Sequence, residues 1–357
     1  MPVPTSPEAG AGIAEIAPAR PRAVSGGLPS VDATEKLPER ENPLLWCLRL
    51  DGRGGATSVH WEEVPAGAPS GGEGEWVHLE RLHPEAERWL REVARVPEVF
   101  LPALLEDDVR PRTLREADGL LFVLQTINAN PGAEPDDMVS LRIWASPGRL
   151  VSLRHRRVRV GQSTAESLRR GAGPSDLGAL LLALVEAATD EVERAVESLE
   201  ERLDELEVPA ADAAGASSRR RLVELRRDVL SFHRHLVPQR LALAQLLRLD
   251  LDWLAPRESA RKARLREAVE QASRAVDELL ALGERCKVVG DELALRASEE
   301  LNRRLYLLSV AAAIFLPVTA LAGIMGANVG GIPGAERPNG SGGCAPPRSA
   351  WRCSPTG

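Results

Sequence analysis

The sequence has few cysteines and no excess of basic charge. Its 357 residues include four cysteines, none of them paired as C-x-x-C, which argues against a disulfide framework and a cysteine zinc site. Acidic residues outnumber basic ones by 52 to 45, so the net charge of −7 lacks the basic footprint of a general nucleic-acid binder. The first twelve residues show neither a basic start nor an apolar run, so we expect the soluble part of the chain to face the cytoplasm.

Catalytic signatures are missing as well. The sequence contains no P-loop, no G-x-G-x-x-G loop and no Ser/His/Asp nucleophile motif. His233 and His235 are two residues apart, so on a helix they would point about 200° apart and could not readily share an ion. His78 and His83 are interpreted as surface or turn residues. Five tryptophans are expected to pack in a core or interface: Trp46, Trp61, Trp76, Trp89 and Trp144. We therefore expect neither an enzyme nor a bound cofactor.

Residues 41–173 have the pattern of an α/β domain. The preceding residues 1–40, rich in Pro, Ala, Gly and Ser, cannot bury enough apolar surface to offset the entropy of ordering, so they are predicted to form a disordered tail. Short apolar or alternating runs separated by turn clusters predict strands at 44–50, 57–64, 119–127, 138–145 and 149–155. Helices are expected near 84–95 and 97–106, and a hairpin turn at 52–55.

Residues 174–300 are predicted to form long helices. Ser175 followed by Asp176 supplies an N-cap for the first of them. Its apolar seam is spaced as in a coiled coil, at Val192, Leu199, Leu203 and Leu206. A second helix is expected from about Ser218 to Trp253. A third begins after Pro256 and, if continuous to Met325, would be about 100 Å long, which favours a stalk that enters a membrane.

The first long helix carries a lopsided charge. Ten acidic residues lie between Glu186 and Glu207, against only Arg194 and Arg202. One interpretation is a solvated face. The other is a stretch that attracts divalent cations by electrostatic focusing, for which the candidate residues are Glu186, Asp190, Glu193 and Glu197.

A 21-residue run without charge follows the helical region. Residues 305–325 are long enough to cross a bilayer core, and a transmembrane helix continuous with the stalk is predicted at 301–326. Arg303 and Arg304 immediately before the run favour an N-terminal side in the cytoplasm. The alternative is a buried core helix.

The small and polar residues in and just before this run fall, together with three leucines, on one stripe whose members recur every three or four positions and therefore share one helical face. The stripe consists of Asn302, Leu305, Leu308 or Ser309, Ala312, Leu316, Thr319 and Gly323. Such a face indicates either helix–helix packing in a membrane or, in a symmetric ring, the lining of a pore. The spacing does not choose between the two.

The segment GIMGANVGGIPG at 323–334 carries a family resemblance. Its Gly326-Ala327-Asn328 triplet, after an apolar run, resembles the G-x-N signature of the CorA magnesium-transporter superfamily, in which Met is the more common middle residue. The NVGGIPG that begins at Asn328 resembles the ZntB-type zinc-transporter branch. Further stretches similar to that branch are 106–114, 128–144 and 302–334, and the resemblance covers roughly residues 42–336.

The resemblance implies an architecture and a site. It implies an α/β cytoplasmic domain and a long helical stalk, five copies of which form a CorA-like funnel at the cytoplasmic membrane and transport zinc or magnesium. The first membrane helix of each subunit, which is the one transmembrane helix predicted in this chain, would line the pore. Asn328, in a periplasmic loop at 327–338, would belong to a ring at the outer mouth, and Asn302 to a polar ring at the cytoplasmic end. Leu305 and Leu308 would form a hydrophobic constriction, and Thr319 a hydroxyl ring.

The residues after Asn339 depart from the family pattern. The family carries a second membrane helix here, but 339–357 contain three prolines and no apolar run that could span a bilayer. A shifted reading frame or a sequencing error is one hypothesis, and we expect the chain as written to be impaired in assembly or transport. A non-conducting, membrane-anchored coiled-coil scaffold and a non-functional fragment are the alternatives. Passive and proton-coupled transport both remain open.

Overall fold

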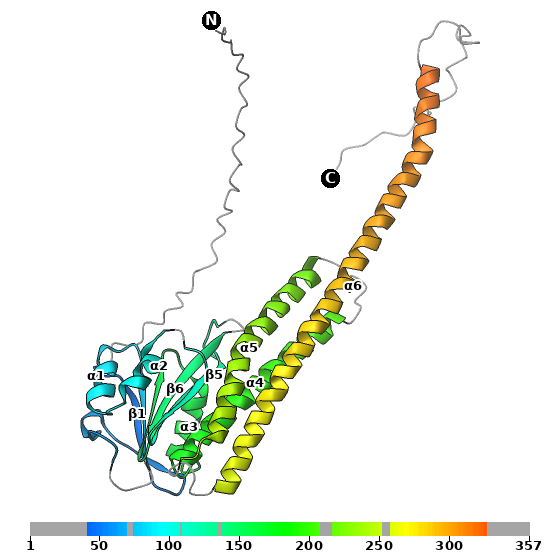
Figure 1. Ribbon diagram of the computed structural model, residues 1–357. Coiled ribbons are helices and arrows are strands. Elements are labelled where there is room, and N and C mark those ends of the chain that lie inside the picture. The colour runs from blue at the N-terminus through cyan, green and yellow to red at the C-terminus, as the bar shows by residue number, and fades with distance from the viewer. Residues whose placement is uncertain are drawn as a thin grey trace, which may run out of the picture. The chain divides into compact units, whose positions relative to one another are not determined.

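The computed structural model describes residues 41–69, 74–107, 109–133, 137–207, 216–251 and 258–326. Within these ranges, seven strands form one mixed sheet in the order β2-β1-β3-β7-β6-β5-β4 (Figure 1). Their bounds are β1 Leu44–Leu50, β2 Ala56–Ser58, β3 Glu75–Glu80, β4 Arg112–Glu116, β5 Gly119–Ile127, β6 Met138–Ser146 and β7 Arg149–Arg154. Strands β3 and β7 pair in parallel, and every other neighbouring pair is antiparallel.

Most predicted strands are present, and one is wrong in part. Strands β1, β5, β6 and β7 agree with their predicted ranges to within one residue, and the hairpin turn joins β1 to β2. The predicted strand at 57–64 is strand only to Ser58 and contains a 3-10 helix at Trp61–Glu63. The helix forms because Val59 and Val64 both turn into the core, which an extended chain with alternating faces could not achieve at that spacing.

One face of the sheet carries the apolar core. Helix α1 (Pro84–Glu92) begins with Pro84 at its first turn, after His83, whose side chain accepts a hydrogen bond from the amide of Glu85. A 3-10 helix at Glu98–Phe100 leads into the short helix α2 (Leu101–Leu105). Side chains from these helices and from β1, β3, β5, β6 and β7 form one buried cluster, which includes Cys47, Val77, Trp89, Leu104, Trp144 and Leu153.

The opposite face of β1, β3 and β7 holds a polar layer near helix α3 (Arg159–Arg169). The indole of Trp76 donates to Ser152 Oγ at 2.7 Å, and the same oxygen lies 2.7 Å from His78 Nδ1. The Trp46 ring stacks on His78 at 4.1 Å, and Gly161 of α3 faces Trp46. The expectation of a surface or turn position is therefore wrong for His78, which is fully buried, and correct for His83.

The burial of His78 predicts a loss of stability in acid. Burial, aided by the charge of Arg154, holds the pKa of His78 well below 6.5. The unfolded chain protonates this histidine near pH 6.5 while the folded chain leaves it neutral, so its contribution is present above pH 6.5 and is lost as the pH falls. Urea unfolding followed by tryptophan fluorescence should give about 1.4 kcal/mol less stability at pH 5.5 than at pH 7.5. His78→Gln should remove this component, and an unchanged pH dependence in the variant would contradict the assignment.

Three long helices follow the sheet. They are α4 (Leu177–Glu207), α5 (Ala216–Arg248) and α6 (Glu258–Gly326), of 31, 33 and 69 residues. Asp176 caps α4, because its Oδ1 accepts a hydrogen bond from the amide of Ala179 at 3.0 Å. The predicted third helix is thus continuous, with Pro317 inside it, and its length is about 100 Å.

The chain divides into two compact units. The first contains the residues up to Thr189 together with Leu241–Ala268, and the second contains Asp190–Arg240 and the residues from Val269 onward. In the second unit the predicted seam of α4 is buried at Val192, Leu199, Leu203 and Leu206. Ion pairs join α4 to its neighbours: Arg202 to Asp228 of α5 at 2.7 Å, and Arg285 of α6 to both Asp204 and Glu207.

Candidate functional site

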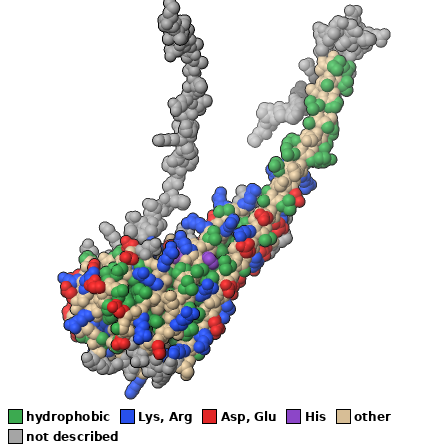
Figure 2. All heavy atoms as spheres, viewed as in Figure 1, with side chains coloured by type: hydrophobic (Ala, Val, Ile, Leu, Met, Phe, Trp, Pro, Cys, Tyr) green, Lys and Arg blue, Asp and Glu red, His purple; other side chains and the backbone are tan. Residues whose placement is uncertain are grey.

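The C-terminal part of α6 is exposed and apolar. An 18-residue window of this helix has a mean hydropathy of 2.3, and none of it is buried in the single chain. In Figure 2 this end of the helix carries hydrophobic and neutral side chains without acidic or basic ones. Large side chains such as Phe315 and Met325 are 67% and 82% exposed, so lipid or other protein must cover them to make this surface stable. By length and composition this is a helix that could cross a membrane.

The predicted stripe lies on this exposed helix. Asn302, Leu305 and Leu308 lie where the apolar part of α6 begins. Leu316 and Thr319 follow about two turns further along the helix. Helical geometry from Glu258 to Gly326 keeps these positions on one face. All five side chains are exposed, so they are available to other copies of the chain.

Two residues modify the backbone of the apolar segment. Thr319 Oγ1 donates to the carbonyl of Phe315 at 2.8 Å, which uses the hydroxyl proton and leaves oxygen lone pairs free to accept from water or to face a cation. Pro317 has no amide proton, so the carbonyl of Ala313 lacks its usual helical donor. The segment therefore presents oxygen atoms within an otherwise apolar helix.

Gly326 is the last residue of α6. The rest of the predicted mouth, Ala327 and Asn328, lies outside the described residues, as do the loop at 327–338 and the segment at 339–357. The predictions made for them stay predictions.

Sequence comparison identifies the family. The model of the family described as CorA-like Mg2+ transporter protein matches residues 71–344, which is more than half of the chain. The chain belongs to the CorA-like family. Its predicted fold class is confirmed: a mixed α/β sheet domain, long helices and one candidate apolar helix at the end of α6.

Several relatives of this CorA-like chain bear functional names. It is 35% identical to the divalent cation transporter CmaX of Pseudomonas aeruginosa over 302 residues, 84% of this chain and 90% of the relative. It is 32% identical to the zinc transport protein ZntB of Yersinia enterocolitica over 291 residues, 81% of this chain and 86% of the relative. The expectation that the chain is not an enzyme is confirmed, because the CorA-like family and its ZntB relatives are ion transporters.

Solved structures agree with the fold. The full-length CmaX structure matches with a TM-score of 0.74 at 35% identity, covering 85% of this chain and 93% of that one. The complete CorA magnesium transporter of Methanocaldococcus jannaschii matches with a TM-score of 0.66 at 17% identity, covering 82% and 90% of the two chains, which shows a shared fold alone.

The four acidic candidates on α4 have different surroundings in the CorA-like chain. Glu186, in the first compact unit, is ion-paired with Arg264. In the second unit Asp190 and Glu197 are exposed and Glu193 is half-buried. Among the residues that the structure describes, no group of three or more His, Cys, Asp or Glu side chains is placed to hold a metal ion.

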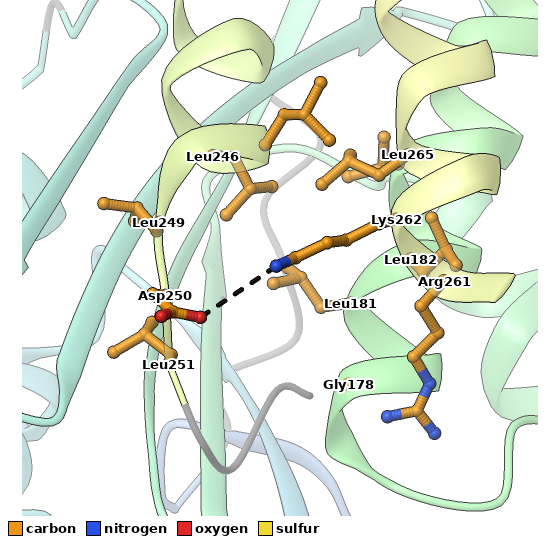
Figure 3. Close-up of a pocket in the computed structure, with 12 residues that line it drawn as sticks. Gly178, Leu181, Leu182, Leu246, Leu249, Asp250, Leu251, Arg261, Lys262 and Leu265 are labelled. Atoms are coloured by element: carbon orange, nitrogen blue, oxygen red, sulfur yellow. Dashed lines mark ion pairs between the residues drawn. The ribbon is translucent and has the colours of Figure 1, made fainter. Parts of the chain in front are cut away.

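A small apolar cavity in the first unit is not suited to an ion. It has a volume of about 50 Å³, and eight of its twelve lining residues are aliphatic, contributed by α4, by α6 and by the end of α5 together with the residues just after it (Figure 3). Lys262 reaches across it to within 4.0 Å of Asp250, and Arg261 pairs with Asp176. With both cations matched by carboxylates, the cavity has room for little more than a small apolar group.

The structure also reveals polar residues that the sequence reasoning missed. The charges of Glu193, Glu197 and Glu200 of α4 act on Glu278 of α6. Partial burial, followed by repulsion from these carboxylates, raises the pKa of Glu278. The three α4 residues are spaced four and three apart, and this helical spacing was the available signal, but nothing in the sequence places Glu278 beside them.

Proposed function

We propose that this chain is a subunit of a homopentameric divalent-cation transporter in the cytoplasmic membrane, and that zinc is its main substrate. The proposal rests on one observation: the exposed stripe of Asn302, Leu305, Leu308, Leu316 and Thr319 on a helix long and apolar enough to span a bilayer. The names of the zinc-transporting and divalent-cation-transporting relatives support it. Arg303 and Arg304 before the apolar run favour a cytoplasmic N-terminal side.

Oxygen atoms on the stripe suit a hydrated cation. The amide of Asn302 and the hydroxyl of Thr319 can bind the water shell of an ion, while Leu305 and Leu308 between them would form a constriction that closes by dewetting. The described stripe offers no Cys or His ligand, so the ion would pass with its water rather than by direct coordination to soft ligands. Five copies around an axis would close the exposed face of the helix on itself.

A flux assay tests this function. The full-length protein in liposomes that contain a zinc-sensitive dye should accumulate zinc above protein-free liposomes, at a rate reduced by the expected impairment from residues 339–357, and excess magnesium should compete weakly. Equal competition by magnesium would overturn the zinc preference. Oligomers without any flux would instead favour the membrane-anchored scaffold.

A further inference from the structure

Helix α5 carries a narrow exposed stripe that alternates arginine with aliphatic residues. Its members are spaced three and four residues apart: Arg220, Val223, Arg227, Leu230, Arg234 and Val237, of which Val237 is half-buried and the other five are exposed. Val223 and Leu230 are 69% and 60% exposed, whereas the opposite face of α5 is buried through Leu225, Val229 and Phe232. A strict three–four stripe of one residue's width is typical of a helix–helix seam rather than of a helix lying on a membrane.

The arginines of this stripe lack acidic partners within the described chain. Arg220, Arg227 and Arg234 form no ion pair there, although Arg221, next to the stripe, pairs with Glu205. The acidic residues of α5 are Glu224 and Asp228, and Asp228 is buried against Arg202. Three guanidinium groups therefore stand in a row at seven-residue intervals, about 10 Å apart, beside exposed aliphatic side chains.

The same unit carries a complementary acidic surface on its other side. Glu193, Glu197 and Glu200 of α4 are spaced four and three residues apart; Glu197 is exposed and the other two are half-buried. Ion pairs of Arg285 of α6 with Asp204 and Glu207 place α4 beside α6 here. The charges of Glu200 and Glu193 act on the exposed Glu278 of α6 more strongly than the opposing charge of Arg274, so acidic charge predominates on this surface. Glu193 and Glu200 are seven residues apart, so this row has the same length of about 10 Å as one interval of the arginine stripe.

The two surfaces face opposite directions. The inner face of α5 packs on α6, where Val229 lies against Gly283 and Leu222 against Gly290. The carboxylates lie where α4 meets α6, and the stripe points away from both helices. A surface and its complement on different sides of one subunit make a head-to-tail contact rather than a two-fold dimer, and such contacts form a ring when the rotation between copies closes.

We infer that the α5 stripe docks against the α4/α6 carboxylate surface of a second copy of this chain. Two arginines one heptad apart meet the row from Glu193 to Glu200, and the contact removes the exposed surface of Val223 and Leu230 from water. The inference rests on the proposed homo-oligomer and adds the surfaces that hold it together.

Charge reversal with a shifted control tests this contact. The full-length protein in detergent micelles is weighed by native mass spectrometry at equal concentrations. Arg220→Glu with Arg227→Glu should shift the oligomer to monomer, with at least tenfold weaker association. Arg219→Glu with Arg226→Glu makes the same charge change on the flank of the stripe beside Val223 and Leu230, about 100° from Arg220 and Arg227, and should weaken association less than tenfold. Circular dichroism confirms that each variant remains helical.

Reversal of the acidic side provides the rescue. Adding Glu193→Arg and Glu200→Arg to the Arg220→Glu/Arg227→Glu protein should restore the oligomer. An oligomer unaffected by the stripe variant, a failed rescue, or a monomeric unmodified protein would each overturn the inference. Zinc flux is measured on the same preparations. Flux by the unmodified protein together with an insensitive oligomer would reject the interface alone, and a charge-dependent oligomer without flux would reject the transport proposal alone.

Discussion

Replacing Asn302 with leucine is expected to lower zinc flux at least tenfold while leaving the mass of the oligomer unchanged. In the proposed pore this substitution removes a full ring of amide oxygens from the cytoplasmic end, where an ion exchanges bulk water for the narrow passage. A tenfold loss corresponds to about 1.4 kcal/mol in the barrier, which is comparable with the cost of leaving one polar contact of the ion's water shell unmade. Stopped-flow fluorescence of zinc-loaded liposomes measures the rate directly.

Two further variants locate the effect on the stripe. Leu307→Ala changes the opposite face of the same helix and should leave flux within a factor of two. The double variant Asn302→Leu/Leu301→Asn keeps the composition but moves the amide by about 100°, so it should remain as slow as Asn302→Leu alone. Recovery of flux in the double variant would show that the amide acts without regard to the helical face, contrary to the proposed pore.

The second large effect concerns the ion pair buried in the sheet. Glu75 of β3 accepts two hydrogen bonds from Arg149 of β7, at 2.7 and 3.1 Å, and both side chains are fully buried. Arg149 also donates to the carbonyl of Pro65 and lies over the Trp89 ring. Glu75→Gln leaves a buried guanidinium without its counter-charge and should destabilise the protein by about 3–5 kcal/mol, measured by urea unfolding.

Removing both charges should cost much less than removing one. The variant Glu75→Leu/Arg149→Met replaces the pair with apolar side chains of similar size and should recover most of the lost stability. Arg49 contacts Glu75 from the surface at 3.4 Å with half of its side chain exposed, so Arg49→Gln should change stability by less than about 1 kcal/mol. A double variant as unstable as Glu75→Gln would show that shape, not charge, governs this site.

Strands could be predicted from the sequence where their apolar or alternating residues form a clear run. Strands such as Gly119–Ile127 and Met138–Ser146 have long apolar or alternating runs, and their bounds were predicted almost to the residue. Strand β3 was missed because Glu75, His78 and Glu80 interrupt its apolar pattern, although all six of its residues are buried. Those polar side chains are tolerated inside because Arg149, Ser152 and Arg154 of β7 lie beside them in the parallel register.

Part of the candidate site could likewise be predicted from the sequence and part could not. The apolar run and its stripe are local properties of α6, so the sequence alone located Asn302 and Thr319 on one face. The electrostatic interaction of Glu278 with Glu193, Glu197 and Glu200 joins residues about 80 positions apart, and helical spacing carries no information about which helices pack together.

Because α6 is one continuous helix, the direction in which its apolar side chains point is fixed by the direction of the side chains in its soluble part. Val289 and Leu293 face the interior of the second unit, and the stripe begins at Asn302 with no break between them. Inserting one residue near position 298 would turn every later side chain by about 100° around the helix. The amide of Asn302 and the hydroxyl of Thr319 would then no longer face the proposed pore, although the composition of the stripe would be unchanged. Inserting seven would turn them by only about 20°. Length changes in this region are therefore tolerated in steps of whole heptads, and a single-codon deletion would be as disruptive as the loss of the polar residues themselves.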